Sequence, residues 1–581
     1  MRNLLPLMPY LRRHRLLIGI GVLVAALSAG FSTIPPYLLG QAVEELNAGG
    51  VTTSLLLRYS GLILAAAVMD SIFKFGMRRL VGGSSYAIEY ELRNDLFGQF
   101  LRLDQGFYGS NHTGDLMARM TNDLSAVRQL LGPGVTSIVS SGLTFLFVGV
   151  LMLRMDLQLG LLALILLPLI SATFVILGER LRDRFRLVQD QFGHISTRAQ
   201  ENFSGIRTIK AYAQEEAELN VFGEANREYQ KLNLSYVLLS ALVWPLMTLL
   251  LTLTVALVLI VGGQAVATGR LSLGDFVRFN AYLGLLTWPM IALGWTVNLL
   301  QQGSASMARI AEVLHRPPTI ATGREVQPRG KVVGAVEFRN VGVRYGDTWV
   351  LRNVSLLIPT GSTTAVVGAT GAGKTTLTNL IARVQDPTEG QVLVDGLDVR
   401  EWPLETLRSG IGYVPQDTFL FSVPLHENVT FGRPDADDAA VDKALLVSQL
   451  VNDVPQFPSG LRTMIGERGV TLSGGQKQRA AIARAVLREA AITVLDDAMS
   501  SVDTHTAAEI LRNLRKVMQG RTSILIAQRI ATVKDADQIV VLHNGAIVER
   551  GTHAELVQLN GRYAGMYKRE LLQAELEETE Q

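Results

Sequence analysis

The residues with the clearest chemical purpose form a glycine-rich run in the second half of the chain. An apolar segment over residues 363–368 (TTAVVG) predicts a buried strand. The run GATGAGKTT follows over residues 368–376, and a helical pattern, LTNLIARV, comes next. This G-x-x-x-x-G-K-[ST] spacing is typical of a loop that wraps phosphate groups. Glycines let backbone N–H groups turn toward phosphate oxygens, and the helix N-terminus adds a partial positive charge.

We therefore expect the loop to hold the phosphates of a nucleotide. Lys374 should reach the β- and γ-phosphates, and the Thr375 hydroxyl should bind Mg²⁺. The loop residues expected at the nucleotide are Gly368, Thr370, Gly371, Gly373, Lys374, Thr375 and Thr376.

An acidic pair ends a second apolar segment further along the chain. Residues 490–497 (AAITVLDD) predict a strand with Asp496 and Asp497 at its end. An apolar strand that ends in Asp is common by itself. After a phosphate loop it indicates a carboxylate for Mg²⁺, so we assign Asp496 to the metal, directly or through water.

A second anion-binding turn lies between these two motifs. The sequence LSGGQ over residues 472–476 precedes an arginine-bearing helical pattern, KQRAAIARAVL. A Ser-Gly-Gly turn that opens a helix suits a phosphate, so the candidate residues here are Ser473, Gly474, Gly475 and Gln476. One nucleotide does not require two separate phosphate-binding turns from the same chain. The second makes sense if it grips the nucleotide of another subunit.

The elements that carry these motifs follow a long apolar half. The chain has 581 residues, is 48% hydrophobic and only 18% charged, and has a mean hydropathy of +0.25. Six apolar segments are each near the ~20 residues that cross a bilayer as a helix, too many to bury in one soluble domain. They lie at 16–39, 55–77, 132–153, 157–178, 237–261 and 279–300.

Basic residues set the expected orientation of these segments. Arg12, Arg13 and Arg15 precede the first span, and Arg78 and Arg79 follow the second. Because cytoplasmic loops carry the excess of Lys and Arg, we predict a multi-pass protein of the cytoplasmic (inner) membrane with both termini in the cytoplasm. Residues 3–11 could form a short amphipathic segment on the cytoplasmic surface.

The connections between spans are unequal in length. Those at 78–131 and 179–236 are polar and rich in helix formers. We expect each to be two spans that continue into the cytoplasm and meet at a turn, near residues 105–107 and 204–205 respectively.

The chain divides into two blocks. We predict an all-α membrane domain with six extended transmembrane helices at 1–315, a Pro/Gly-rich linker at 316–335, and an α/β phosphate-loop domain with a largely parallel sheet at 336–581. The net charge of +2 gives no electrostatic case for nucleic acid. The chain has no cysteine, which excludes disulfides and thiolate metal sites.

The order of motifs resembles that of an ABC transporter, specifically a multidrug-resistance-like half-transporter of the exporter type. LSGGQ followed by Q-x-R is the most specific match. The segments 112–123, 201–215 and 463–469 (TMIGERG) also resemble exporter sequences. This resemblance implies an ATP-binding cassette that binds ATP and Mg²⁺, and a lipid bilayer as its setting.

Three further residues take roles from the resemblance. Tyr345 (NVGVRY) resembles the aromatic residue that stacks on adenine. Gln416 (GYVPQD) resembles the glutamine that senses Mg²⁺ and contacts the membrane domain. Asp503 (SSVD) resembles the aspartate that contacts the other half of a dimer. Taken alone, Tyr345 could be a core strand residue and Gln416 a surface turn.

The resemblance also implies a dimer. Each ATP would lie between one chain's phosphate loop and the other chain's signature. In two places this chain departs from the family pattern. Asp497 stands where the general base is usually Glu, and Gln528 stands where the switch residue is usually His. A displacement of about 1 Å can cost roughly 100-fold in a positioned step, and Gln cannot carry the charge of an imidazolium.

We therefore expect this chain's own site to bind ATP but hydrolyse it poorly, with catalytic positions Asp497, Gln528 and Gln416. Its intact signature would serve a second half-transporter in a heterodimer. The alternatives are a homodimeric slow ATPase exporter or lipid floppase, and a regulatory subunit or ATP-gated channel.

The sequence says little about the transported compound. An apolar cavity with aromatic faces suits a hydrophobic drug, lipid or peptide. Candidate lining residues are Phe145, Phe147, Trp244, Trp288, Trp295, Asn280 and Asn298, although each could equally face lipid or pack between helices. Asp70 and Lys74, four residues apart in the second span, could be functional or an internal ion pair.

Overall fold

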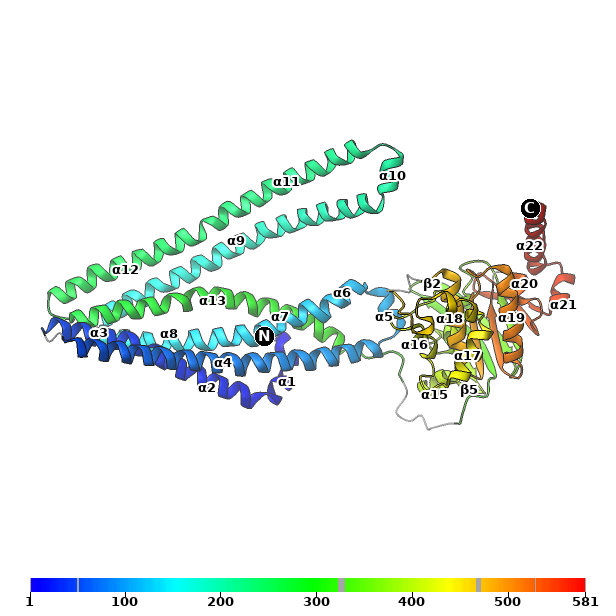
Figure 1. The fold of residues 1–581 in the computed structure, drawn as a ribbon, viewed down its shortest axis with the longest axis horizontal. Coiled ribbons are helices and arrows are strands. Elements are labelled where there is room, and N and C mark those ends of the chain that lie inside the picture. The colour runs from blue at the N-terminus through cyan, green and yellow to red at the C-terminus, as the bar shows by residue number, and fades with distance from the viewer. Residues whose placement is uncertain (1, 50–51, 322–329, 467–471, 528, 580–581) are drawn as a thin grey trace. The chain divides into compact units, whose positions relative to one another are not determined.

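The computed structural model of the chain describes residues 2–49, 52–321, 330–466, 472–527 and 529–579 (Figure 1). Contacts divide the chain into two compact units. The first comprises residues 1–101 and 112–316, and the second comprises residues 102–111 and 317–581. The prediction of a helical N-terminal domain and an α/β C-terminal domain is confirmed. The short segment 102–111 clusters with the second unit although it lies within the sequence of the first.

The first unit is helical throughout its described elements. A 3₁₀ turn at Arg2–Leu7 and π-helical turns at Arg119–Asp123 and Leu130–Gly134 join its α-helices. These are α1 (Met8–Arg13), α2 (Arg15–Ser32), α3 (Ile34–Asn47), α4 (Thr53–Arg102), α6 (Thr113–Ala118), α7 (Leu124–Gln129), α8 (Val135–Met155), α9 (Leu157–Ser204), α10 (Ile206–Ala211), α11 (Glu215–Ala241), α12 (Val243–Ala267) and α13 (Leu273–Leu314).

Five helical stretches of the described residues are long and apolar enough to cross a membrane. They are Arg15–Asn47, Thr53–Arg102, Thr113–Met155, Glu215–Ala267 and Leu273–Leu314. The expected span at 157–178 falls in α9, where only the shorter apolar stretch Leu157–Leu166 is found among the described residues. Six spans therefore remain a prediction.

The long helices extend beyond the length of a bilayer span, as the sequence predicts. Helix α4 has 50 residues and α9 has 48, against the ~20 that cross a bilayer. They end at Arg102 and Ser204, beside the two expected turns. The N-terminal segment is fixed to α4, because the Tyr10 hydroxyl donates to Asp95 at 2.6 Å and Arg13 pairs with Glu91 at 2.8 Å.

A buried polar cluster joins the first π-helical turn to the end of α13. The Asp123 carboxylate is 5% exposed and accepts hydrogen bonds from Ser306 Oγ and Arg309 Nε, both at 2.9 Å. Arg119, also buried, donates to Asp115 at 3.1 Å and to Glu312 at 3.3 Å. Satisfied buried polar networks of this kind fix one arrangement of the helices that carry them.

The second unit contains two sheets. A four-stranded antiparallel sheet has the order β2 (Thr348–Ile358), β1 (Val336–Tyr345), β4 (Glu389–Val394) and β5 (Leu397–Asp398). A six-stranded sheet has the order β10 (Ala546–Gly551), β9 (Gln538–His543), β3 (Thr363–Val367), β8 (Thr522–Ile526), β7 (Ile492–Asp496) and β6 (Ile411–Val414).

Only the six-stranded sheet matches the predicted parallel one, with β10 as its antiparallel edge. The antiparallel sheet was missed. Its first hairpin turns at Gly346, which directly follows β1 and has a positive φ of +57°. A Gly-Asp pair between two β-branched runs is a hairpin signal that the sequence did offer.

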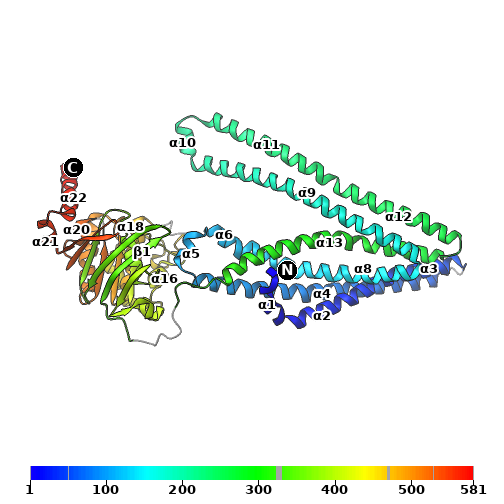
Figure 2. The same ribbon diagram turned by 180° about the vertical axis from the view of Figure 1, so that it is seen from behind.

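The second unit also contains ten α-helices among its described residues. They are α5 (Gln105–Ser110), α14 (Lys374–Ile381), α15 (Leu404–Ser409), α16 (Leu425–Thr430), α17 (Asp438–Val447), α18 (Gly474–Leu487), α19 (Thr504–Met518), α20 (Ile530–Val533), α21 (His553–Gln558) and α22 (Arg562–Thr579). Figure 2 shows β1, α16 and α18 from the side opposite Figure 1.

Alternation along the parallel strands builds two cores. In β3, Val366 packs with α14 and the antiparallel sheet, while Ala365 and Val367 pack with α18 and α19 on the other face. A third cluster joins α16, α17 and α18. Because neighbouring side chains point to opposite faces, a strand buried on both sides must be apolar throughout. The sheet is thereby a rigid support for the loops at its strand ends.

Candidate functional site

A pocket forms where the parallel strands β3 and β7 end, beside β8. Strand β8 lies between them, so their carboxyl ends share one edge of the sheet. The pocket brings together residues that lie far apart in the sequence. Its lining is Val350, Thr370, Gly371, Gly373, Lys374, Thr375, Thr376, Gln416, Asp496, Asp497 and Ile526.

The loop before α14 is shaped by its glycines. Gly373 has a φ of +98°, a conformation that side chains disfavour. A Cβ there would also lie 2.9 Å from the Val350 carbonyl oxygen and 2.7 Å from Leu351. Gly373 precedes α14, and as a glycine it has no side chain to cap the amides of the first turn. Those N–H groups are therefore left for a ligand, and an anion is what a helix N-terminus favours.

Lys374 lies over this loop. Its Nζ donates to the carbonyl oxygens of Gly368 and Ala369, both at 2.9 Å. Burial lowers the pKa of Lys374, and the charges of Asp497 and Asp496 oppose that shift. The loop carbonyls thus hold the ammonium group within the pocket, where it could meet a phosphate.

Asp496 and Thr375 form the acidic side of the pocket. The Asp496 side chain is 1% exposed, and its Oδ2 atom has no hydrogen-bond partner within the described part of the chain. Burial raises the pKa of Asp496 and Asp497 raises it further, while Thr375 and Lys374 lower it. A buried carboxylate oxygen without a partner, beside a hydroxyl, fits a hard cation that takes its remaining ligands from phosphates and water.

The described residues contain no cluster of three or more His, Cys, Asp or Glu that could hold a metal by themselves. The donor set therefore fits Mg²⁺ bound together with a nucleotide, as the sequence predicts, better than a resident metal centre.

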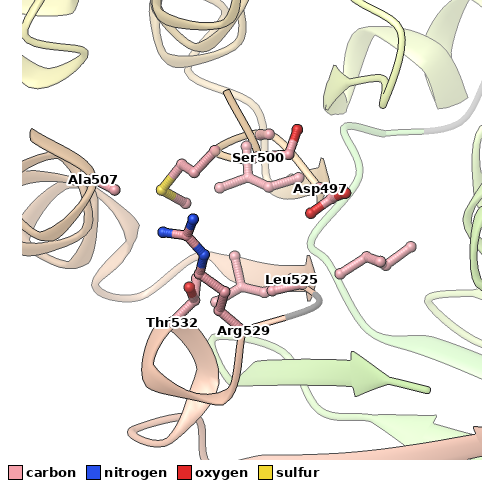
Figure 3. Close-up of a pocket in the computed structure, with 11 residues that line it drawn as sticks. Asp497, Ser500, Ala507, Leu525, Arg529 and Thr532 are labelled. Carbon is pink, nitrogen blue, oxygen red and sulfur yellow. The ribbon is translucent and has the colours of Figure 1, made fainter. Parts of the chain in front are cut away.

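Asp497 follows Asp496 in an uncommon backbone conformation. Its φ is +47°, a left-handed region that Asp tolerates better than most residues. Asp497 also borders a second cavity, with Ala498, Met499 and Ser500 beside it and Arg529 and Thr532 opposite. Figure 3 shows the Arg529 side chain reaching into this cavity, with Asp497 at its other end. Gln528, the other catalytic prediction, lies outside the described residues.

Gln416 and Tyr345 occupy different places. Gln416 lies just after β6 and lines the pocket. Tyr345 ends β1, is 52% exposed, and donates its hydroxyl hydrogen bond to Gln385. It is not among the pocket residues, so its exposed ring remains only a candidate for stacking on a base.

The signature residues lie at the N-terminus of α18 and not in the pocket. The Ser473 Oγ accepts from the Gln476 N–H at 3.3 Å, and the Gln476 Oε1 accepts from the Ser473 N–H at 3.0 Å, a reciprocal capping box. None of Ser473, Gly474, Gly475 and Gln476 is among the described residues that line the Lys374 pocket.

A charged pair that the sequence analysis missed anchors this turn. Asp453 accepts from Gln476 Nε2 at 3.1 Å and pairs with Arg479 at 2.7 Å. Both side chains of the ion pair are largely buried, at 10% and 13% exposed. Asp453 lies in a polar stretch between short turns, with no spacing that would have marked it.

The turn after β7 packs on the signature glycines. A Cβ on Gly475 would lie 3.0 Å from the Ser501 carbonyl oxygen, so close approach requires glycine here. Gln478 holds the same turn, since it donates to Ser500 at 2.8 Å and accepts from the Ser501 N–H at 2.9 Å. Asp503 caps α19 by accepting from the Thr506 N–H at 2.9 Å, and that bond lowers the pKa of Asp503.

The segment 463–469 is described only to residue 466. Thr463 accepts from the Leu425 N–H at 3.0 Å, which joins this segment to α16. The expected exporter residues 467–469 lie outside the described residues.

In the first unit, a separate cavity of about 890 Å³ lies among α4, α8, α12 and α13. It includes three of the expected residues, Trp244, Trp288 and Trp295. The others are elsewhere: Phe145 packs against a core cluster, Phe147 is half-buried, Asn280 bonds to the Phe276 carbonyl at 3.0 Å, and Asn298 lies 3.5 Å from Arg182.

The Asp70 and Lys74 pair has local partners. Lys74 Nζ is 2.7 Å from one Asp70 oxygen, and Ser28 donates to the other at 2.6 Å. These contacts favour the simpler interpretation, an ion pair that also ties α2 to α4.

Family models match both halves of the chain. The ABC transporter transmembrane region matches residues 18–290, and the ABC transporter model matches residues 351–500. A solved bacterial Atm1-family ABC exporter with ATP bound has a TM-score of 0.80 and 27% identity, covering 96% of this chain and 98% of that one.

Three curated relatives span most of the chain. The "Probable multidrug resistance ABC transporter ATP-binding/permease protein YheI" of Bacillus subtilis is 38% identical over 93% of this chain and 92% of its own. The "Multidrug resistance-like ATP-binding protein MdlA" of Escherichia coli is 35% identical over 98% and 96%. An "ATP-dependent lipid A-core flippase" of Syntrophus aciditrophicus is 36% identical over 82% and 80%.

Proposed function

The chain belongs to the ABC transporter family as an exporter with an ATPase domain. On that premise we propose how ATP binding and ATP hydrolysis are distributed between this chain and a partner. ABC exporters work as dimers in a membrane. In our proposal this chain is one half of a heterodimer. Its phosphate-loop pocket binds ATP and hydrolyses it poorly, and its signature completes the active site of the partner.

The single observation that carries the two-chain site is the separation of the two anion-binding turns. The pocket around Lys374 contains phosphate-loop and acidic residues, but no described signature residue. The α18 turn with Ser473 is capped by its own side chains. A nucleotide gripped from both sides therefore needs a signature from a second chain.

The helical hairpin formed by α9, α10 and α11 is further support for the proposal that this chain binds a partner subunit. Both views show α9 and α11 running side by side, joined by α10 (Figures 1 and 2). No residue of α10 or α11 is buried, and large side chains stay exposed near the turn, with Phe203 at 76% and Tyr212 at 73%. Aromatic groups left uncovered at the end of a long lever suit docking to another subunit.

ATP and Mg²⁺ would be held by residues already in the pocket. The amides at Gly371, Gly373 and Lys374 and the Lys374 ammonium suit the phosphates, while Thr375, Asp496 and Gln416 suit the ion. Bound Mg²⁺ neutralises phosphate charge during hydrolysis. Tyr345 would stack on the base, and Asp503 would face the partner.

In this proposal, Asp497 and Gln528 are the reason for weak ATP hydrolysis at this chain's own site. The Asp497 carboxylate is one methylene shorter than the usual Glu, so a water held by it would be displaced. Its left-handed backbone suits Asp and would be more costly for the longer residue. Gln528 can hydrogen-bond a phosphate but cannot carry a positive charge.

The transported compound in this proposal is hydrophobic or amphipathic. Support comes from the cavity with three tryptophans and from relatives whose names include multidrug resistance and lipid A-core flippase.

The domain organisation is also part of the proposal. The membrane domain would span residues 1–315 with six transmembrane helices, followed by a linker at 316–335 and the cassette at 336–581. Both termini would be cytoplasmic in an inner membrane, as the basic residues flanking the first two spans predict.

The test restores the family residues in this chain. In the assembled exporter in lipid, the double variant Asp497→Glu, Gln528→His should raise Mg²⁺-dependent ATP turnover by about twofold, since a second site of similar rate becomes active beside the first. Asp497→Asn is the matched control, because it removes the carboxylate without changing its length, and it should leave turnover near the original value. A large loss with Asp497→Asn would instead favour a homodimeric slow exporter whose two equal sites rely on Asp497.

A further inference from the structure

The cavity of the first unit has walls of opposite chemistry. It holds about 890 Å³, within the range of sites that enclose a small amphiphile. Its lining comes from α4, α7, α8, α12 and α13, plus the π-helical turn before α8. The residues are Met77, Arg78, Gly82, Ser85, Tyr86, Arg128, Gly132, Pro133, Thr136, Ser137, Ser140, Ser141, Val243, Trp244, Trp288, Ile291, Ala292 and Trp295.

One wall is apolar and aromatic. Trp288, Ile291, Ala292 and Trp295 follow the i, i+3, i+4, i+7 spacing of a single face of α13, and Trp244 joins them from α12. Trp244 is 68% exposed and Trp288 is 69% exposed, so these indoles are not packed into the protein core. Their faces are free to cover an apolar body.

Another part of the lining is polar. Thr136, Ser137, Ser140 and Ser141 lie on one face of α8 and line the cavity. Arg78 and Tyr86 lie eight residues apart on one face of α4. The Arg128 guanidinium lies 4.8 Å from the centre of the Tyr86 ring, which fixes it against that helix.

The charge of this wall is positive. Arg128 pairs with Glu89 at 3.0 Å, but Glu89 also pairs with Arg93 at 2.6 Å, so one carboxylate faces two guanidinium groups. Arg78 is exposed and has no ion pair among the described residues. No Asp or Glu is among the described lining residues. An anion can therefore enter without meeting a like charge.

We propose that this cavity binds an amphiphile with an anionic group, with its apolar body against the tryptophans and its phosphate, sulfonate or carboxylate at Arg78 and Arg128. The proposal rests on the proposed function, since it names the substrate class of that exporter. A bare anion would leave the tryptophan wall exposed, and a cationic amphiphile would face two arginines. Hydrogen bonds from guanidinium to an anionic oxygen are the strong, charge-assisted kind.

Equilibrium binding to the full chain, in nanodiscs of zwitterionic phosphatidylcholine and without nucleotide, tests the proposal. The probes are a dansylated alkyl sulfonate and the matching trimethylammonium compound, followed by energy transfer from tryptophan. We expect the sulfonate to bind about tenfold more tightly. Arg78→Gln should weaken sulfonate binding about tenfold and leave ammonium binding unweakened. Arg78→Lys should keep most of the sulfonate preference.

Arg79→Gln is the matched control. Arg79 is the next residue of α4 and is also exposed, but it is not among the residues that line the cavity. Equal affinity for the two probes, or equal effects of Arg78→Gln and Arg79→Gln, would overturn the proposal. Retained ammonium binding shows that a variant is folded.

A second arm identifies the source of the anion. If phosphatidylglycerol in the nanodisc competes with the sulfonate in the original chain but not in Arg78→Gln, the occupant is a membrane lipid. If it does not compete and the sulfonate preference remains, the occupant is a soluble amphiphile. Both results support the site. Because no nucleotide is used, failure here leaves the proposed division of ATP hydrolysis intact.

Discussion

Two helices of the second unit begin at glycine-containing turns that suit an anion, but they begin in opposite ways. Helix α14 follows Gly373, which has no side chain to accept hydrogen bonds from the first amides. Helix α18 follows Ser473, whose side chain and that of Gln476 satisfy each other's backbone N–H groups. The first turn is open and the second is closed by its own residues.

The difference indicates which turn can hold a ligand without help. Open amides beside Lys374 gain hydrogen bonds when a phosphate arrives. The capped turn must exchange bonds it already has, so its net gain is smaller. We infer that the α14 pocket binds nucleotide first, and that the α18 turn joins a site only when another chain presents a bound nucleotide.

The largest expected effect comes from the anchor of the closed turn. Asp453→Ala removes one partner of a largely buried ion pair and leaves Arg479 uncompensated, so we expect the free energy of unfolding of the second unit to fall by about 3 kcal/mol. Urea unfolding of the intact chain, followed by fluorescence, measures this.

The matched control replaces both charges. Asp453→Leu with Arg479→Met should recover much of the loss, because no buried charge is left without a partner. A cost below about 1 kcal/mol for Asp453→Ala would mean that this pair does not hold the turn.

The next effect concerns the open turn. Lys374→Ala should weaken ATP binding to this chain by roughly 100-fold, because the partly buried ammonium that would pair with the phosphates is lost. Binding of a fluorescent ATP analogue to the full chain measures this. Much of the hydrolysis by the assembled exporter should survive, since the proposed heterodimer hydrolyses ATP mainly at the partner's site. Loss of all turnover at saturating ATP would argue against that division.

Ser473→Ala tests the capped turn at the start of α18. We expect a loss of about 1 kcal/mol of stability from the missing cap. ATP binding by this chain should be unchanged, while turnover of the assembled exporter should fall about tenfold. Ser473→Thr keeps a hydroxyl and is the control. Weaker ATP binding by the isolated Ser473→Ala chain would place the signature at its own pocket and refute the shared site.

The smallest effect is a pH dependence at the acidic side of the pocket. Burial raises the pKa of Asp496, so the folded chain holds that proton more tightly than the unfolded chain. Stability from this group is greatest below the ordinary carboxyl range and is lost as pH rises through the raised pKa. Asp496→Asn should therefore stabilise the nucleotide-free chain at neutral pH, by roughly 1 kcal/mol.

The same variant should lose that advantage in acid, where Asp496 is protonated. Thermal melting between pH 4 and about pH 8 follows both effects. Equal melting shifts at all pH values would show that the charge of Asp496 is not what destabilises the pocket.

The sequence predicted the motif residues better than the residues that hold them in place. The phosphate loop, Asp496, Asp497 and Gln416 could be assigned because each belongs to a short pattern with a chemical reason, and the fold brings them to one pocket. Asp453 could not be found in this way, because its partners Gln476 and Arg479 are more than 20 residues away and the contact depends on tertiary packing.

The membrane half shows the same limit. Tryptophans stood out in an apolar sequence, and Trp244, Trp288 and Trp295 do share a cavity. Arg78 was assigned only to orientation, and Arg128 was not noticed, because helix periodicity alone does not tell which neighbouring face completes a cavity. The antiparallel sheet was missed because its hairpin signal at Gly346 was outweighed by the α/β pattern that follows.

The most direct test of the account compares ATP binding and Mg²⁺-dependent hydrolysis for this chain alone and co-expressed with a candidate half-transporter, both in lipid. We predict that the chain alone binds ATP with little turnover and that the mixture hydrolyses ATP at a rate the single chain does not reach. Robust turnover by the chain alone, unchanged when the partner is added, would contradict the account and make Asp497 and Gln528 sufficient for catalysis.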